Sequence, residues 1–129
     1  MQLVETETLR KWLEEGRPVT VLDIRAPADR EQWSIPGSIH VDADEPLKVG
    51  DADALSGVDL PKDRPVVTIC NAGKVSQVAA EQLRKRGINA FPLAGGMKAW
   101  SLAWNTAVLV LGNTTVVQVR RTRSASSYS

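Results

Sequence analysis

Short apolar runs alternate with helical stretches along this chain, and this alternation limits the fold more than any other feature. PVTVLDIR begins at Pro18 and PVVTIC ends at Cys70, and both runs are apolar on successive residues. Continuous runs of this kind are typical of strands that are buried on both faces of a sheet. NAFPLAGG, which starts at Asn89, is a third candidate strand. Because helical patterns lie between these runs, we predict an open α/β fold with a parallel sheet covered on both faces.

Periodicity and helix-breaking residues predict the remaining elements. Thr6 can cap a helix that ends at Gly16, and a short helix is expected over residues 28–33, before a brief strand at 38–41. Residues 42–64 are rich in Asp, Gly and Pro, which predicts a surface loop with one helical turn. After the cysteine, a helix is expected whose inner stripe is Val75, Val78, Ala79 and Leu83.

Composition excludes several classes of protein. The chain has 129 residues, enough for one domain with a real core, and 16 basic residues balance 15 acidic ones. This balance gives no reason to expect a nucleic-acid or membrane partner. One cysteine and one histidine provide neither an internal disulfide nor a zinc cluster, so no metal is expected. The N-terminus lacks the apolar stretch of a signal peptide, and a cytoplasmic location is predicted.

The single cysteine occupies a position suited to chemistry. Cys70 ends an apolar strand, and in parallel sheets ligands bind beyond the carboxyl ends of the strands. Residues 71–76 lead into a helix, so their backbone N–H groups lack intrahelical partners and can converge on the sulfur. Gly73 permits a tight loop, and Lys74 adds positive charge. These features favour thiolate chemistry over an inert buried cysteine.

Three motifs follow one another along the chain, VLDIRAPADREQWSIPGSIHV, CNAGKVSQVAAEQLRKRG and PLAGGMKAW. In this order they resemble the rhodanese-like sulfurtransferase family, and the resemblance covers about residues 3–104. It implies a rhodanese-like fold, a five-stranded parallel sheet between helices, in which Cys70 accepts a sulfane sulfur as a persulfide. No cofactor is implied. The residues expected to bind the substrate are those of the loop, Asn71, Ala72, Gly73, Lys74, Val75 and Ser76.

The loop departs from the family pattern in its charges. Relatives that use thiosulfate often carry arginines where this chain has Asn71 and Val75, and Lys74 is the remaining cation of the loop. A lysine offers a point charge without the bidentate fork of arginine. We therefore expect weak use of thiosulfate and better use of low-molecular-weight or protein persulfides.

The spacing of residues argues against two other functions, phosphatase activity and calcium binding by an EF-hand. Phosphatases that share this fold need a longer loop that ends in an arginine, with five residues between the cysteine and the arginine, and the chain has Ser76 at that position. An EF-hand that starts at Asp51 would need Asp or Asn at position 55 and Gly at 56, where Leu55 and Ser56 stand.

Polar residues at the end of the first strand are interpreted as structural support. Arg25 is expected to pair with Glu31, and Asp23 to bond nearby backbone, so that together they hold the turn from strand to helix. His40 is expected to be structural, because a thiolate stabilised by the loop needs no general base.

The C-terminal segment, residues 105–129, is predicted to lie outside the domain formed by residues 1–104. Two β-prone runs flank Gly112 and Asn113, which favours a hairpin, and a basic, Ser-rich tail with the composition of disordered segments follows. The segment also resembles the linker of rhodanese domains fused to a metallo-β-lactamase-like domain. The alternative is a hairpin that covers a sheet edge or pairs with a second subunit as a homodimer.

Two functional classes follow from these observations. In the first, the protein is an enzyme that moves sulfur from a small-molecule donor, thiosulfate or a persulfide, through Cys70 to a thiol or cyanide. In the second, it is a low-turnover persulfide carrier or regulatory binding module that hands sulfur to a protein acceptor or a fused domain. The cysteine loop favours the enzyme, and the missing loop arginines favour the carrier.

Overall fold

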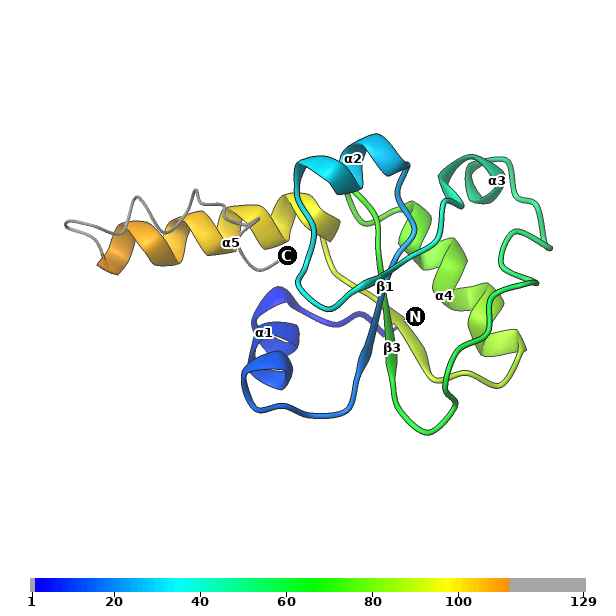
Figure 1. Ribbon diagram of the computed structural model, residues 1–129, viewed down its shortest axis with the longest axis horizontal. Coiled ribbons are helices and arrows are strands. Elements are labelled where there is room, and N and C mark those ends of the chain that lie inside the picture. The colour runs from blue at the N-terminus through cyan, green and yellow to red at the C-terminus, as the bar shows by residue number, and fades with distance from the viewer. Residues whose placement is uncertain (1, 112–129) are drawn as a thin grey trace.

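A parallel sheet forms the centre of the protein. The computed structural model describes residues 2–111, and the side chains of residues 2–103. Its strands are β1 (Thr20–Asp23), β2 (Ile39–His40), β3 (Val66–Ile69) and β4 (Ala90–Pro92), in the order β2-β1-β3-β4 (Figure 1). Every neighbouring pair is parallel. The predicted α/β fold with a parallel sheet is therefore confirmed.

The fifth strand of the expected sheet is reduced to a single residue. Val4 forms an isolated parallel bridge with Leu93, just beyond β4. The Val4 amide donates to the carbonyl oxygen of Pro92 at 3.0 Å, and the Ala94 amide donates to the carbonyl oxygen of Val4 at 2.8 Å. The N-terminal segment thus occupies the fifth position at this edge of the sheet.

Helices cover both faces of the sheet. The described helices are α1 (Thr6–Glu14), α2 (Pro27–Gln32), α3 (Asp44–Lys48), α4 (Val75–Lys85) and α5 (Gly96–Leu111). Figure 1 shows α1 and the start of α5 on one side of the strands and α3 and α4 on the other, while the rest of α5 extends away from the body. The sheet is thus the middle layer of three.

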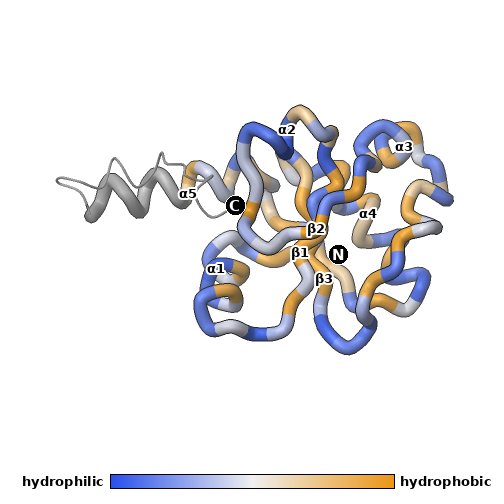
Figure 2. Tube along the Cα trace, viewed as in Figure 1, coloured by the Kyte–Doolittle hydropathy of each residue, from blue (hydrophilic) through white to orange (hydrophobic). Residues whose placement is uncertain are grey.

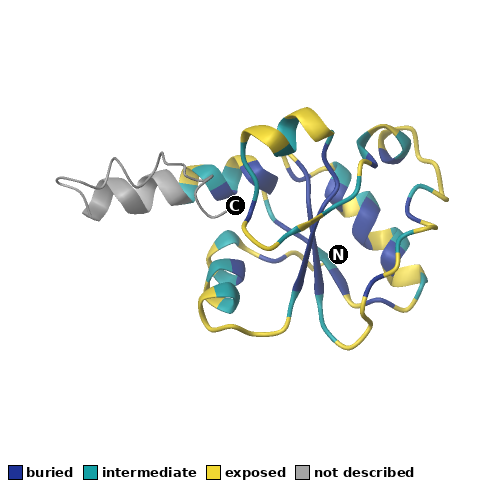
Figure 3. Cartoon of the chain, viewed as in Figure 1, coloured by how far each residue is buried: buried dark blue, intermediate teal, exposed yellow. Residues whose placement is uncertain are grey.

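Successive residues of each strand contribute to two separate cores. Val66 and Cys70 belong to the core beneath α3 and α4, whereas Val67 and Ile69 belong to the core beneath α1 and α5. Because strand side chains alternate between faces, both faces can be buried only where successive residues are apolar. Figure 2 shows the apolar strands at the centre of the molecule, and Figure 3 shows that they are its most buried part. Cys70 therefore belongs to the α4 side of the sheet.

Two local predictions need correction. Thr6 is the first residue of α1 and not its cap, a position that Glu5 takes without a capping side-chain bond. The segment 42–64 contains a helix that the prediction of a loop missed, α3. This helix forms because Leu47 is fully buried, and Lys48 pairs with Asp44 at 2.9 Å on its exposed side.

The C-terminal segment also differs from the prediction. Residues 106–111, expected to form the first strand of a hairpin, continue α5 to Leu111. No Gly or Pro interrupts the sequence from Met97 to Leu111, so the helix that starts at Gly96 has no local reason to stop before Gly112. The turn and second strand of the expected hairpin, the tail and the expected dimer contact fall in residues 112–129, outside the described residues.

Candidate active site

The candidate nucleophile lies where the sheet meets α4. Cys70 directly follows β3, and its residue is only 3% exposed. The backbone amide of Gly73 donates a hydrogen bond to Cys70 Sγ at 3.0 Å. Of the donors expected from residues 71–76, this is the one hydrogen bond to the sulfur within the described part of the chain. A buried sulfur with an amide aimed at it is a site where negative charge on the sulfur is stabilised.

Glycine at position 73 is required by backbone geometry and by packing. Gly73 has φ of +97°, in the left-handed region that side chains with a Cβ rarely adopt. A Cβ at this position would also lie 2.9 Å from the backbone nitrogen of Gly95. The loop therefore turns tightly over the sulfur and packs directly against the segment that precedes α5.

The N-terminus of α5 holds the loop by two backbone hydrogen bonds. The Met97 amide donates to the carbonyl oxygen of Cys70 at 2.8 Å, and the Lys98 amide donates to that of Asn71 at 2.9 Å. A Cβ on Gly96 would collide with the Cys70 carbonyl oxygen. Free amides at a helix start are thus used to fix the backbone of the nucleophile.

A buried ion pair supports the loop from the end of β1. Arg25 donates to Asp23 through Nε at 2.9 Å and through Nη2 at 2.8 Å, and its Nη2 also donates to the carbonyl oxygen of Trp33. Asp23 further accepts the Arg25 amide at 3.0 Å, as expected for a carboxylate that bonds nearby backbone. The predicted pairing of Arg25 with Glu31 is wrong. Glu31 is exposed on α2, whereas Asp23 is buried beside the guanidinium and matches its fork.

The one histidine of the chain contacts the backbone at the end of β1. His40 Nε2 lies 2.8 Å from the carbonyl oxygen of Arg25, so the ring ties β2 to the end of β1. This contact orients the segment that carries the ion pair, and it does not involve the cysteine.

Asn71 connects the loop to α2. Its Nδ2 donates to Asp29 Oδ2 at 3.0 Å, and its Oδ1 accepts a long bond from Arg25 Nη1 at 3.5 Å. Together with the Lys98 amide on its carbonyl oxygen, Asn71 is held from three elements that are distant in sequence. Asn71 therefore has a positioning role in the loop.

The expected substrate-binding residues differ in where their side chains lie. Asn71, Ala72 and Lys74 are exposed, Gly73 is buried, and Val75 packs against the core under α4. Ser76 is fully buried, and its hydroxyl has no hydrogen-bond partner among the described residues. Asn71 and Ala72 are the two loop residues that line the neighbouring pocket described next.

A pocket of about 380 Å³ borders the loop. Its walls come from the end of β1, α2, the loop and the first turns of α5, and its lining residues are Arg25, Asp29, Gln32, Trp33, Asn71, Ala72, Met97, Lys98 and Ser101. Sequence reasoning missed Asp29 and Lys98, the charged members contributed by α2 and α5. Their only signal in the sequence is their place inside the first and third motifs.

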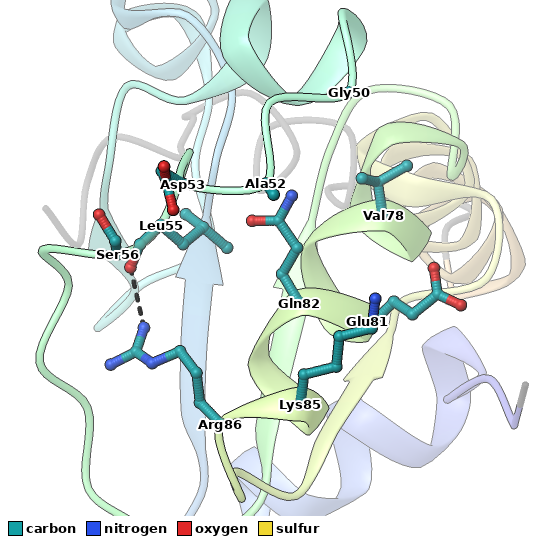
Figure 4. Close-up of a pocket in the computed structure, with 10 residues that line it drawn as sticks. All are labelled: Gly50, Ala52, Asp53, Leu55, Ser56, Val78, Glu81, Gln82, Lys85 and Arg86. Atoms are coloured by element: carbon teal, nitrogen blue, oxygen red, sulfur yellow. Dashed lines mark hydrogen bonds between the residues drawn. The ribbon is translucent and has the colours of Figure 1, made fainter.

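A second pocket, of about 370 Å³, lies between α4 and residues 50–56 (Figure 4). None of its lining residues belongs to the cysteine loop. Arg86, at the end of α4, donates to the carbonyl oxygens of Leu55 and Val58 at 2.8 and 2.7 Å, so this side chain fastens the segment to the helix. Of these two pockets, the one beside Asn71 is therefore the one that borders the cysteine loop.

The described residues contain no cluster of His, Cys, Asp and Glu side chains that could hold a metal ion. The part of the chain covered by the structure also has no helix both long and apolar enough to cross a membrane.

Comparisons with known proteins agree with this geometry. The pattern of the Rhodanese-like domain family matches residues 5–103. A "Sulfurtransferase" from Allochromatium vinosum is 30% identical over 100 residues, which are 76% of this chain and 86% of that protein. "Probable adenylyltransferase/sulfurtransferase MoeZ" from Mycobacterium tuberculosis is 33% identical over 95 residues, 72% of this chain but only 23% of the relative.

Among solved structures, a Rhodanese-like Domain Protein from Staphylococcus aureus superposes with a TM-score of 0.63 at 26% identity, covering 78% of this chain and 91% of that one. The match of the family pattern spans most of the chain and includes the cysteine loop, the buried ion pair and the glycine pair before α5. The chain belongs to the rhodanese-like domain family.

Proposed function

We propose that the protein is a sulfurtransferase that carries a sulfane sulfur as a persulfide on Cys70. The observation that carries this proposal is the Gly73 amide, which donates to Cys70 Sγ at 3.0 Å in a loop fixed from α5. Such a preorganised donor stabilises the negative charge that the sulfur carries during transfer. Relatives named as sulfurtransferases support sulfur transfer as the general activity.

The reaction needs no external oxidant or reductant. The Cys70 thiolate attacks the outer sulfur of a donor, R–S–SH; the S–S bond of the donor breaks, a new S–S bond forms at Cys70, and the thiolate RS⁻ leaves. The proton of the outer sulfur is then lost to solvent. A nucleophile such as cyanide takes the outer sulfur as thiocyanate and returns the Cys70 thiolate, so charge and atoms balance at each step.

The donor is proposed to be a persulfide in preference to thiosulfate. Thiosulfate would leave as the sulfite dianion, and the loop has no arginine to bind it bidentately. Arg25 lines the pocket, but its charge is used by Asp23 at 2.8 Å. Asp29 lines the same pocket and opposes a dianion, while Lys98, the remaining charged lining residue, offers a point charge without a bidentate pair of donors.

A second candidate function is that of a persulfide carrier. The chain spans about a quarter of the first matched relatives, which are larger proteins named for two activities. In such a setting the Cys70 persulfide is handed to a protein acceptor and turns over slowly with small molecules. The small share of these relatives that the chain spans supports this candidate, because the acceptor can then belong to another part of a larger protein.

A turnover assay separates the two candidates. Thiosulfate or glutathione persulfide is supplied with cyanide or a thiol to the wild type and to Cys70→Ser, and product per protein is counted. Many turnovers that are lost in Cys70→Ser support the enzyme. One sulfur gained per chain, with no further product, supports the carrier. Failure of every donor to load the wild type would reject both.

A further inference from the structure

The pocket beside the loop is lined by two residues of opposite charge, Asp29 and Lys98, that are both hydrogen-bonded to Asn71. Asp29 accepts a hydrogen bond from the Asn71 side chain at 3.0 Å, and the Lys98 amide donates to the Asn71 carbonyl oxygen at 2.9 Å. Both residues line the pocket, Asp29 from α2 and Lys98 from α5. The Asp29 carboxylate is therefore fixed beside the residue that follows Cys70, and the exposed side chain of Lys98 extends from a backbone that is bonded to the same residue.

Neither charge is held in an ion pair within the described part of the chain. The ion pairs there do not include Asp29 or Lys98, and Asp29 uses one carboxylate oxygen for Asn71. The third charged lining residue, Arg25, is paired with Asp23 inside the protein. The free charges of the pocket are thus one negative and one positive, a pattern that matches a zwitterion and not an anion.

We propose that this pocket selects a donor that carries an α-amino acid group, namely a persulfide of the cysteine type. Its ammonium would pair with Asp29, its carboxylate with Lys98, and its S–SH group would reach Cys70. This inference deepens the proposed function and rests on it. A volume of about 380 Å³ is at the small end of ligand pockets, roughly 300–1,000 Å³, and suits a small amino acid derivative.

The transfer is the one described above, with the leaving group now specified. Cys70 Sγ attacks the outer sulfur of the cysteine-type persulfide, the S–S bond of the donor breaks, and the cysteine thiolate leaves from the pocket. Because Asp29 and Lys98 contact the part of the donor that does not react, they are specificity-determining residues. They should act on KM more than on kcat.

The test varies the donor and the protein together. The donors are cysteine persulfide, N-acetylcysteine persulfide, which lacks the ammonium, and cysteamine persulfide, which lacks the carboxylate. The variants are Asp29→Asn, which keeps an acceptor for Asn71, and Lys98→Met, which keeps the amide bond to Asn71. The rate of sulfur gain on Cys70 in the full chain is followed by rapid quench and intact mass, against donor concentration.

Each variant should discriminate among the donors. Asp29→Asn should raise KM by about fivefold for cysteine persulfide and cysteamine persulfide, the size expected of one partly exposed ion pair, with a clearly smaller effect on the N-acetylated donor. Lys98→Met should affect cysteine persulfide and N-acetylcysteine persulfide more than cysteamine persulfide. The ratio of variant to wild type is compared for each donor, because this cancels differences in the donors' own reactivity.

Matched controls come from the pocket in Figure 4. Asp53 and Lys85 line that pocket and are exposed, so Asp53→Asn and Lys85→Met remove the same charges away from Cys70. Both should leave all KM values unchanged. Equal effects of each pocket variant on all three donors would overturn the charge-pair proposal while the proposed function stands. Absence of any sulfur gain on wild-type Cys70 would overturn both.

Discussion

The backbones of Gly73 and Gly95 lie in contact, so closely that a Cβ on Gly73 would come within 2.9 Å of the Gly95 nitrogen. Residue 73 belongs to the cysteine loop and residue 95 to the segment before α5. This contact places the only loop amide bonded to the sulfur, among the described residues, under the control of a distant part of the chain.

Gly73→Ala should reduce sulfur transfer as well as stability. The Cβ must move the loop away from Gly95, and the left-handed φ of +97° adds strain of about 1–3 kcal/mol, so the amide of residue 73 leaves the sulfur. We expect kcat/KM for persulfide transfer to fall at least about tenfold, equivalent to about 1.4 kcal/mol.

Gly16→Ala is the matched control for this variant. Gly16 has φ of +70° after α1, but a Cβ there meets no atom within 4 Å. It therefore introduces the backbone strain without crowding the loop. Activity should be kept and stability should fall by about 1 kcal/mol. Full activity in Gly73→Ala would contradict the role given to the loop geometry.

Gly96→Ala should destabilise the protein and impair transfer together. A Cβ on Gly96 collides with the Cys70 carbonyl oxygen and comes within 2.8 Å of Asn71 carbonyl atoms. Relief of this collision must break the bonds from the Met97 and Lys98 amides to the loop. Urea denaturation should show a loss of about 2–4 kcal/mol, from two hydrogen bonds and a strained backbone. A variant as stable as the wild type would show that α5 does not fix the loop.

Arg25→Met should cost about 3 kcal/mol of stability, because it leaves the buried Asp23 carboxylate without its main partner. Arg30, whose Nη1 lies 3.5 Å from Asp23, can compensate only in part. Glu31→Gln is the control, since Glu31 is exposed and does not pair with Arg25. That change should stay within about 0.5 kcal/mol. An equal loss of stability in the two variants, measured by chemical denaturation, would instead support the pairing of Arg25 with Glu31 that the sequence predicted.

Ser76→Ala should leave stability unchanged or raise it slightly. The Ser76 hydroxyl is fully buried without a hydrogen-bond partner among the described residues. Its removal therefore relieves a desolvation penalty of about 1 kcal/mol that no hydrogen bond offsets. Thr68→Val is the contrasting variant. Thr68 Oγ1 donates to the Ser76 carbonyl oxygen at 2.8 Å, and the loss of this bond should cost about 1 kcal/mol. A large loss in Ser76→Ala would reveal an unseen partner for the hydroxyl.

The sheet and its nucleophile were predictable because strands buried on both faces leave a clear pattern. All four residues of β1 and of β3 are buried, as their continuous apolar runs predict. Cys70 follows directly, and Gly73 has the positive φ that a tight loop requires. These features depend on residues that are close together in the sequence, so the type and spacing of those residues predict them.

The walls of the pocket were not predictable, because they depend on contacts between residues far apart in sequence. Asp29 and Asn71 are separated by 42 positions, and both are ordinary exposed or half-buried polar residues. The partner of Arg25 was mispredicted for a related reason. The spacing of Glu31 would allow a pair with Arg25, but the Arg25 guanidinium is buried at the end of the strand and pairs with the buried carboxylate of Asp23. The strand expected at 106–111 failed because β-prone residues continued an existing helix.

The central claim is that Cys70 carries a passenger sulfur, and intact mass after exposure to a persulfide donor tests it most directly. The account predicts that the wild type gains the mass of one sulfur atom, that the gain maps to the peptide containing Cys70, and that a thiol or cyanide removes it. Cys70→Ser should gain nothing under the same conditions. A wild type that gains no sulfur from any donor, or a gain that survives in Cys70→Ser, would contradict it.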